Sequence, residues 1–495
     1  YQDLSFKINL PNTKLGNFSV FGIGGISDIA FLDSEKDTTE NKLDFYGGEG
    51  LDLTNGSDMG AIGITHTLNI NKSSYTRFVV SGTYHKFQTQ VDSIIPSTHD
   101  IVPKYRNDFT QVKLFSSLEY NKKINARHNY TVGANINQLN FDLVDSAYNE
   151  NVDRFNIITD YQGSTYLLQT YFQWQYKITN EITLNPGIHW QYFGLNGSSN
   201  LEPRLGFQWQ YATDRSISLA YGYHSQLMPI TTYFNQEQLP DGSYVKPNKS
   251  LDLLKSHHFV VAHDWRISQN IRLKTEVYYQ KITDAAVNAS KEDSYSVLNQ
   301  GANFYIATPD SLVNKGTGEN YGVDITFEKF ISNGLYYLLT ASVYESKYKG
   351  SDAVERNTAF NGAYVINALL GKDFDMNKVF TKSKKNNTLN IDIKSVWAGG
   401  QRYTPINVEE SLKENHTVYY DDLAYSRQFK DYFRTDFRIA FRQDAKNLTM
   451  EWAIDFQNIF NTRNIYSRQF NTKTGEISEI DQLGLLVVPQ FRIEF

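Results

Sequence analysis

The chain has 495 residues, no cysteine, and 48 basic against 54 acidic side chains. The missing thiols exclude disulfides and thiolate metal centres, and the mild acidity argues against the concentrated basic surface that nucleic-acid binding needs. Aromatic residues make up 14% of the chain although its mean hydropathy is only −0.48, and no run approaches the ~20 apolar residues of a membrane helix.

From its first residues, Tyr1 to Phe6, the chain alternates in the manner of a strand. No signal-peptide pattern is visible, so we expect a mature product or a fragment. Nine short polar breaks follow, and each predicts a tight connection between strands. The clearest is Ser332-Asn333-Gly334-Leu335, because Asn-Gly is the strongest short hairpin signal. The other eight breaks lie at 11–14, Asn71-Lys72, Lys123-Ile124-Asn125, Thr179-Asn180, Thr213-Asp214, Ser268-Gln269, 375–386 and Ala445-Lys446.

Longer polar segments alternate with these breaks. A soluble β-sandwich has no reason to keep its long loops on one side, whereas outer-membrane barrels have short periplasmic turns and long external loops. The pattern therefore predicts such a barrel. The predicted loops are 33–57, 90–107, 142–163, 227–254, 284–317, 349–360, 401–426 and 461–482, with a shorter link at 194–200.

The strands between these breaks carry apolar residues in one alternating register and polar residues in the other. In 433–442, Phe433, Phe437 and Phe441 oppose Arg434 and Arg438. A charged side chain facing lipid near the bilayer centre costs roughly 2–4 kcal/mol, so the polar register is expected to border water. Segments 58–89 and 107–141 alternate less strictly, and the pattern is clearest in 165–178, 181–192, 271–280, 433–442 and 448–457.

These features predict an all-β fold, a transmembrane antiparallel β-barrel with nineteen strands in this chain. Residues 1–495 show no linker and no change in composition or in the alternation of polar and apolar residues, so we expect one barrel domain. An odd count suggests that strands precede Tyr1. Three more would give a barrel of about 22 strands, the size of plugged outer-membrane transporters, whose lumen must be occupied, and one more would give about 20.

Several short motifs, in their order along the chain, resemble those of TonB-dependent outer-membrane receptors of the kind common in Bacteroidota. The resemblance covers essentially all 495 residues and ends on a terminal aromatic, Phe495. The motifs are Asn200-Leu201-Glu202-Pro203-Arg204-Leu205-Gly206, Asn248-Lys249-Ser250-Leu251 followed by His257-His258-Phe259, Asn314-Lys315-Gly316 with Tyr321-Gly322-Val323-Asp324, and Asp455-Phe456-Gln457-Asn458-Ile459-Phe460-Asn461.

The resemblance implies TonB-driven uptake of a nutrient, which could be a siderophore, glycan, peptide or cofactor. The implied partners are an N-terminal plug domain missing from this sequence, the TonB complex, the barrel-assembly machinery and outer-membrane lipid; a surface lipoprotein is a further possible partner. The alternative is a structural or interaction barrel in a surface complex that transports nothing. We expect no enzyme activity, because no Gly-x-Ser-x-Gly, His-Glu-x-x-His or spaced carboxylate pair is present.

Charged residues of the polar register are the first candidate site. Arg434, Asp436, Arg438, Glu451 and Asp455 lie on neighbouring predicted strands. They could contact a plug or a transported ligand, or they could pair with one another within the wall.

Aromatic residues on the long loops are the second candidate site, because loop aromatics often contact ligands and can equally pack loops together. The third is the C-terminal register of Phe491, Ile493 and Phe495, the expected barrel-assembly signal. We predict no metal site and no cofactor, since adjacent His257 and His258 point to opposite strand faces. The loop candidates are Tyr233, Phe234, Tyr244, Phe304 and Tyr305.

Overall fold

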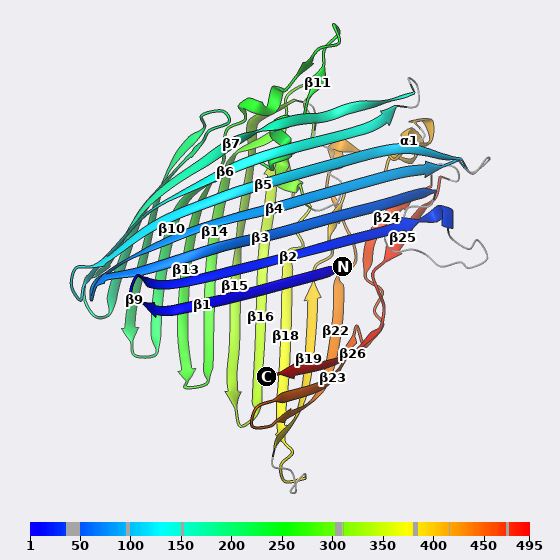
Figure 1. The fold of residues 1–495 in the computed structure, drawn as a ribbon. Helices are drawn as coiled ribbons and strands as arrows, with labels where there is room; N and C mark the ends of the chain where they lie inside the picture. The colour runs from blue at the N-terminus through cyan, green and yellow to red at the C-terminus, as the bar shows by residue number, and fades with distance from the viewer. Residues whose placement is uncertain are drawn as a thin grey trace.

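The computed structural model describes residues 1–35, 50–95, 100–149, 153–301, 309, 311–379, 385–414, 416–471 and 475–495. Its main sheet has 20 antiparallel strands, one of which, β17 (Glu355–Asn357), is a short piece that pairs with β16. The other nineteen pair in chain order, which confirms the predicted strand number. Figure 1 shows the sheet curled into the wall of a barrel.

The nineteen long strands are β1 (Gln2–Thr13), β2 (Gly16–Leu32), β3 (Leu51–Asn71), β4 (Ser74–Ile94), β5 (Ile101–Lys123), β6 (His128–Asn149), β7 (Arg154–Lys177), β8 (Ile182–Phe193), β9 (Ser199–Ala212), β10 (Arg215–Gln226), β13 (Leu254–Ser268), β14 (Ile271–Asn288), β15 (Leu312–Ser332), β16 (Leu335–Lys349), β18 (Tyr364–Asp375), β19 (Asn386–Ala398), β22 (Tyr432–Asp444), β23 (Thr449–Gln457) and β26 (Leu486–Glu494).

Small elements fill the connections at the opposite end from the short turns (Figure 1). No helix in the described part of the chain is long and apolar enough to cross a bilayer. The elements are two-stranded ribbons β11 (Glu237–Gln238) with β12 (Tyr244–Val245), β20 (Arg402–Tyr403) with β21 (Arg427–Gln428) and β24 (Ile465–Phe470) with β25 (Ile477–Asp481), the helix α1 (Val408–Glu414), and the 3-10 turns η1 (Asp33–Glu35), η2 (Ile230–Phe234), η3 (Pro247–Ser250), η4 (Val297–Asn299) and η5 (Asp421–Leu423).

All nine predicted short breaks are connections between consecutive strands. At the Asn-Gly turn between β15 and β16, Asn333 has φ 53° and Gly334 has φ 74°. Positive φ at both central residues is what this turn type requires and what Asn-Gly tolerates.

The main strands extend into several of the predicted long loops, including 33–57 and 284–317, and most of all into 90–107 and 142–163. β4 continues to Ile94 and β5 begins at Ile101, so most of 90–107 is strand. Likewise β6 ends at Asn149 and β7 begins at Arg154, within the predicted loop 142–163. These strand ends lack a clear alternation because apolar residues stand in both registers, for example Val91 and Ile94 on β4 and Leu143 and Val144 on β6. Cross-strand polar pairs accompany the continued ladder, as where Arg106 Nη2 donates to Asp92 Oδ1.

The two edges of the sheet, β1 and β26, each pair with a single neighbour among the described residues: β1 with β2, and β26 with β23. Their outer backbone groups therefore lack ladder partners there. Within a bilayer an unpaired backbone edge is costly, because no water reaches it to form hydrogen bonds.

The outer surface is apolar along the middle of the strands. On β4, Phe78, Val80 and Tyr84 are exposed, and they share one alternating register. Near the short-turn end, the outward rings of His128 and Tyr176 stack with centroids 4.7 Å apart, and Trp174 Nε1 donates to His128 Nδ1 at 3.2 Å. Amphipathic aromatic side chains near the ends of the membrane-spanning strands are typical of the membrane–water interface.

The largest buried apolar cluster lies on the inner side of the wall, beneath the segment between β10 and β13. This segment, 227–253, contributes Tyr233 and Phe234, and the wall contributes Leu139, Phe141 and Leu143 of β6. The inner face is therefore apolar at this place, where a polar register alone was expected.

Candidate functional site

The strand register shows which face of the wall each candidate side chain occupies. Partners in a ladder point to the same face of a sheet, as do alternate residues along one strand. A path of such pairs connects the inner face of β7 with Arg434 of β22. It runs through Gln173, Gly187, Arg204, Gly222, His258, Gln280, Asn320 and Ser346, and then through Ser342, Val365, Asn367, Val396 and Arg434.

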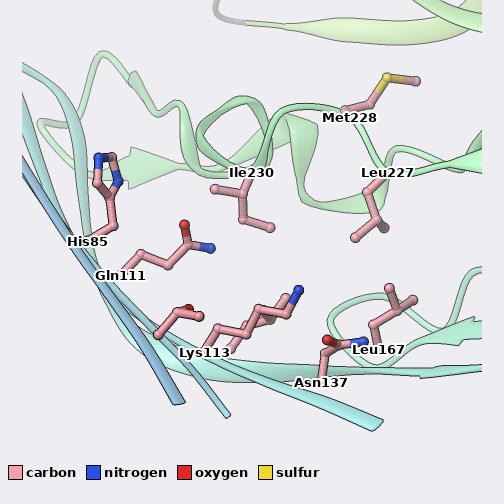
Figure 2. A pocket seen from close by; sticks show the side chains of 10 residues that line it. His85, Gln111, Lys113, Asn137, Leu167, Leu227, Met228 and Ile230 are labelled. Atoms are coloured by element: carbon pink, nitrogen blue, oxygen red, sulfur yellow. The ribbon is translucent and has the colours of Figure 1, made fainter. Parts of the chain in front are cut away.

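A pocket of about 310 Å³ opens on this inner face, between the wall and the 227–253 segment. Such a volume lies at the lower end of the range for small-molecule sites. Figure 2 shows wall side chains rising toward Leu227, Met228 and Ile230 on the opposite side. The ten lining residues are Thr83, His85, Gln111, Lys113, Asn137, Leu139, Leu167, Leu227, Met228 and Ile230.

The wall side of the pocket carries polar groups that have no partner within the described part of the chain. Lys113 Nζ forms no ion pair or hydrogen bond there, and neither His85 nor Gln111 forms a side-chain hydrogen bond. Asn137 is only 5% exposed, and its Oδ1 is buried without a hydrogen-bond donor. A buried, unsatisfied amide oxygen is costly and indicates a site that a ligand or water can complete.

The 227–253 segment is fastened to the wall, so the apolar side of the pocket has a defined position. Phe234 stacks on Tyr161 of β7 with ring centroids 3.7 Å apart, and Tyr233 packs against Phe193 at 5.4 Å. Met228 N donates to the Tyr233 hydroxyl at 3.2 Å, and burial raises the pKa of Tyr233 to about 12. The backbone of Gln236 also donates to Ile158 O at 3.0 Å.

The five predicted lumen charges do lie on the inner face, and the structure brings them together. Arg438 Nη2 donates to Glu451 Oε1 at 2.7 Å, and its Nε lies 3.0 Å from Asp455 Oδ1. Arg434 Nε donates to Asp436 Oδ1 at 2.7 Å. These charges therefore pair with one another and with neighbouring polar groups such as Gln457 and Gln490, and contact with a plug or ligand stays a prediction.

The loop aromatics fall into different environments. Tyr233 and Phe234 are fully buried in the cluster described above, so ligand contact through their side chains would require the segment to move. Tyr244 on β12 is 44% exposed. Phe304 and Tyr305 lie outside the described residues.

A buried acidic network on β8, β9 and β10 was missed by sequence reasoning. Glu202, only 1% exposed, accepts hydrogen bonds from His189 Nδ1 at 2.9 Å, Arg204 Nη2 at 2.9 Å and both the backbone N and Oγ of Ser225 at 2.9 and 2.6 Å. Gln191 Nε2 donates to it at 3.2 Å. The signal was present, because Glu202 lies within the Asn200–Gly206 motif.

Asparagines of the other motifs fasten loops to strand ends. Asn248 Oδ1 accepts from Leu312 N at 2.7 Å, and Asn314 Oδ1 accepts from Asp252 N at 2.8 Å. Asn458, with φ 53°, donates through Nδ2 to Thr462 O at 2.9 Å. The motif positions are thus explained by local hydrogen bonding, since Asn both tolerates positive φ and bonds the backbone.

The C-terminal strand places its aromatic register on the outer face. Phe491 packs on Trp452 of β23 with ring centroids 5.5 Å apart, and Ile493 pairs with Met450. Phe495 follows in the same register and is fully exposed. Within the described residues no cluster of His, Asp or Glu has the arrangement of a metal site.

A family model described as TonB dependent receptor-like, beta-barrel, matches residues 3–471. None of the curated proteins compared with the sequence matches it.

Solved structures with the same fold include the ferric-catecholate import receptor Fiu from Escherichia coli K12, with a TM-score of 0.66, 11% identity and coverage of 99% of this chain and 74% of that chain. The siderophore receptor PiuA from Acinetobacter baumannii has a TM-score of 0.63 and 12% identity, with coverage of 99% of this chain and 74% of that chain. Pseudomonas aeruginosa FpvA bound to heterologous pyoverdines has a TM-score of 0.66 and 11% identity, with coverage of 99% of this chain and 64% of that chain. At these identities the similarity shows the fold.

Proposed function

This chain belongs to the TonB-dependent receptor-like β-barrel family, and from that premise we propose that its inner-wall pocket binds the nutrient that the receptor imports. The barrel is that of an outer-membrane receptor for nutrient uptake, in a class that works with TonB and has a plug domain. The transported compound, be it siderophore, glycan, peptide or cofactor, enters from the long-loop end. The unsatisfied polar groups of the pocket, Lys113 and Asn137 among them, are the observation that carries this proposal.

The charged inner face of β22 and β23 is proposed as the seat of the plug domain. Arg438 and its acidic partners are held in place by one another, which supports a preformed polar surface for a second domain. Further strands that pair with β1 and β26 would complete the wall, since both edges lack partners among the described residues.

The C-terminal register is proposed as the signal for the barrel-assembly machinery. The exposed, outward Phe495 supports this assignment. The Bacteroidota type is proposed on the resemblance of the motifs, among them those at Asn248 and Asn458, alone. A surface lipoprotein at the long-loop end is a further proposed partner.

Deletion of the gene in its own bacterium, compared with deletion of TonB, tests the transport function. We expect the two strains to lose accumulation of the same nutrient, with uptake restored by the full receptor gene. If the receptor deletion leaves every nutrient tested unaffected while the protein is present in the outer membrane, the non-transporting scaffold is the correct function.

A further inference from the structure

We propose that the inner-wall pocket is selective for an amphiphilic organic monoanion, a compound with one carboxylate-like group and an apolar ring or chain. This inference rests on the proposed function and specifies the chemistry of that same site. It follows from the charge of the lining, the division of the lining into two sides, and the height of the pocket in the wall.

Lys113 is the only Lys or Arg among the ten lining residues, and no Asp or Glu is present among them. Its ammonium group has no ion-pair partner within the described ranges. A cation that is not neutralised by its own wall attracts an anion, and the attraction is stronger in a partly dry pocket than in water. The amide groups of Gln111 and Asn137 add uncharged donors beside it.

The opposite side of the pocket is apolar. Leu227, Met228 and Ile230 face the polar wall groups, and Leu167 lies on the wall side (Figure 2). Leu139 of β6 adds to the apolar lining of the wall. Methionine and leucine side chains adapt to the shape of a ring or an alkyl chain. A fully hydrated inorganic anion would gain nothing from this surface, whereas an anion with an apolar body would bury that body against it.

The pocket lies level with the external edge of the apolar band. Outward-facing Tyr84 is the last exposed apolar residue of its register on β4 before Lys86, which pairs with Asp108 at 3.6 Å. Thr83 and His85 of the pocket are the inner-face neighbours of Tyr84. A ligand arriving from the long-loop end therefore meets this site near the entrance of the bore.

The test is an equilibrium titration of the purified full receptor in lipid nanodiscs with three probes: 2-naphthoate, the neutral 2-naphthylmethanol and the cationic 2-naphthylmethylammonium. We expect 2-naphthoate to bind most tightly. Lys113→Met should weaken its binding at least about tenfold and leave the neutral probe unchanged. Ile230→Ser should weaken the anionic and neutral probes alike.

Lys394→Met is the matched control, because it removes an inner-face lysine of β19 outside the pocket. It should leave the affinity for 2-naphthoate unchanged, and an unchanged melting temperature of each variant shows that the barrel is intact. Equal binding of the anionic and cationic probes, or an unchanged affinity in Lys113→Met, overturns the proposal. The titration needs no TonB, so a receptor that binds 2-naphthoate but supports no uptake in cells contradicts the transport function alone.

Discussion

The ring of Phe234, in the segment between β10 and β13, stacks on Tyr161 of β7 with centroids 3.7 Å apart and an interplanar angle of 13°. This contact joins residues far apart in sequence and fixes the apolar side of the inner-wall pocket against its polar side. The pocket therefore depends on the attachment of the 227–253 segment.

Phe234→Ala should loosen this segment, because truncating a fully buried Phe costs roughly 3–5 kcal/mol. The measurement is limited trypsin digestion of the folded protein, with cleavage at Lys246 and Lys249 expected to accelerate. Tyr244→Ala, which removes an exposed ring from the same segment, should leave the cleavage rate unchanged. Equal rates in the two variants would show that the stacked ring does not hold the segment.

Arg438→Met should lower the thermal stability of the barrel, on the order of 1–3 kcal/mol, because Glu451 and Asp455 would lose their common cation on the inner wall. The readout is the temperature at which the heat-modifiable band disappears in semi-native electrophoresis. Arg492→Met provides the control, since Arg492 is 71% exposed and pairs only with Glu494 among the described residues. A larger loss in the control would contradict the assigned role of Arg438.

Glu202→Ala should destabilise the wall at β8–β10 by roughly 3–5 kcal/mol, because Arg204 and His189 lose a buried acceptor together with Ser225. Hydrogen exchange of the backbone amides in these strands measures the effect. Glu181→Ala removes a carboxylate in the nearby short turn, where it contacts only Thr179 among described groups, and should leave exchange unchanged. Unaltered exchange in Glu202→Ala would refute the role of this network.

Phe495→Ala should reduce the amount of receptor assembled in the outer membrane more than Glu494→Ala does. Only Phe495 belongs to the outward aromatic register that includes Phe491, while Glu494 lies in the polar register. Quantitative blotting of outer-membrane fractions compares the two variants. Equal yields would count against the assembly signal.

The loop between β16 and β18 should be pH-dependent. Burial would raise the pKa of Asp352, but the hydrogen bond that Arg356 Nη1 donates to Asp352 Oδ1 at 3.0 Å outweighs burial and holds the pKa below its usual value. A lowered folded-state pKa means that the pair stabilises the loop above the ordinary aspartate pKa of about 4 and that this contribution is lost as pH falls through the folded value.

Proteolysis of this loop by pepsin between pH 4 and pH 2 measures the loss. We expect wild type to become progressively more sensitive over this range as Asp352 is protonated. Arg356→Met should be sensitive at pH 4 already, because its aspartate has no cation partner. Identical pH profiles for wild type and variant would contradict the assignment.

The sequence alone predicted the strand number, the nine short turns and the inner position of Arg434 and Arg438. These features are local, because a side-chain period of two assigns each residue to a face and Asn333-Gly334 selects its own turn. The external ends of β4 to β7 were mistaken for loops, because apolar and polar residues stand in both registers there and the alternation that identifies a strand is lost.

Only the tertiary structure decided which side chains contact one another on the inner face of the wall. No local pattern in 227–253 shows that Tyr233 and Phe234 are buried against the wall while Ile230 borders a pocket with Lys113, because these contacts join segments separated by many strands. Likewise Glu202 gains its donors from three strands only after the ladder has formed. Alternation fixes the direction in which a side chain points, but only the curvature of the whole wall and the path of its loops determine what that side chain meets.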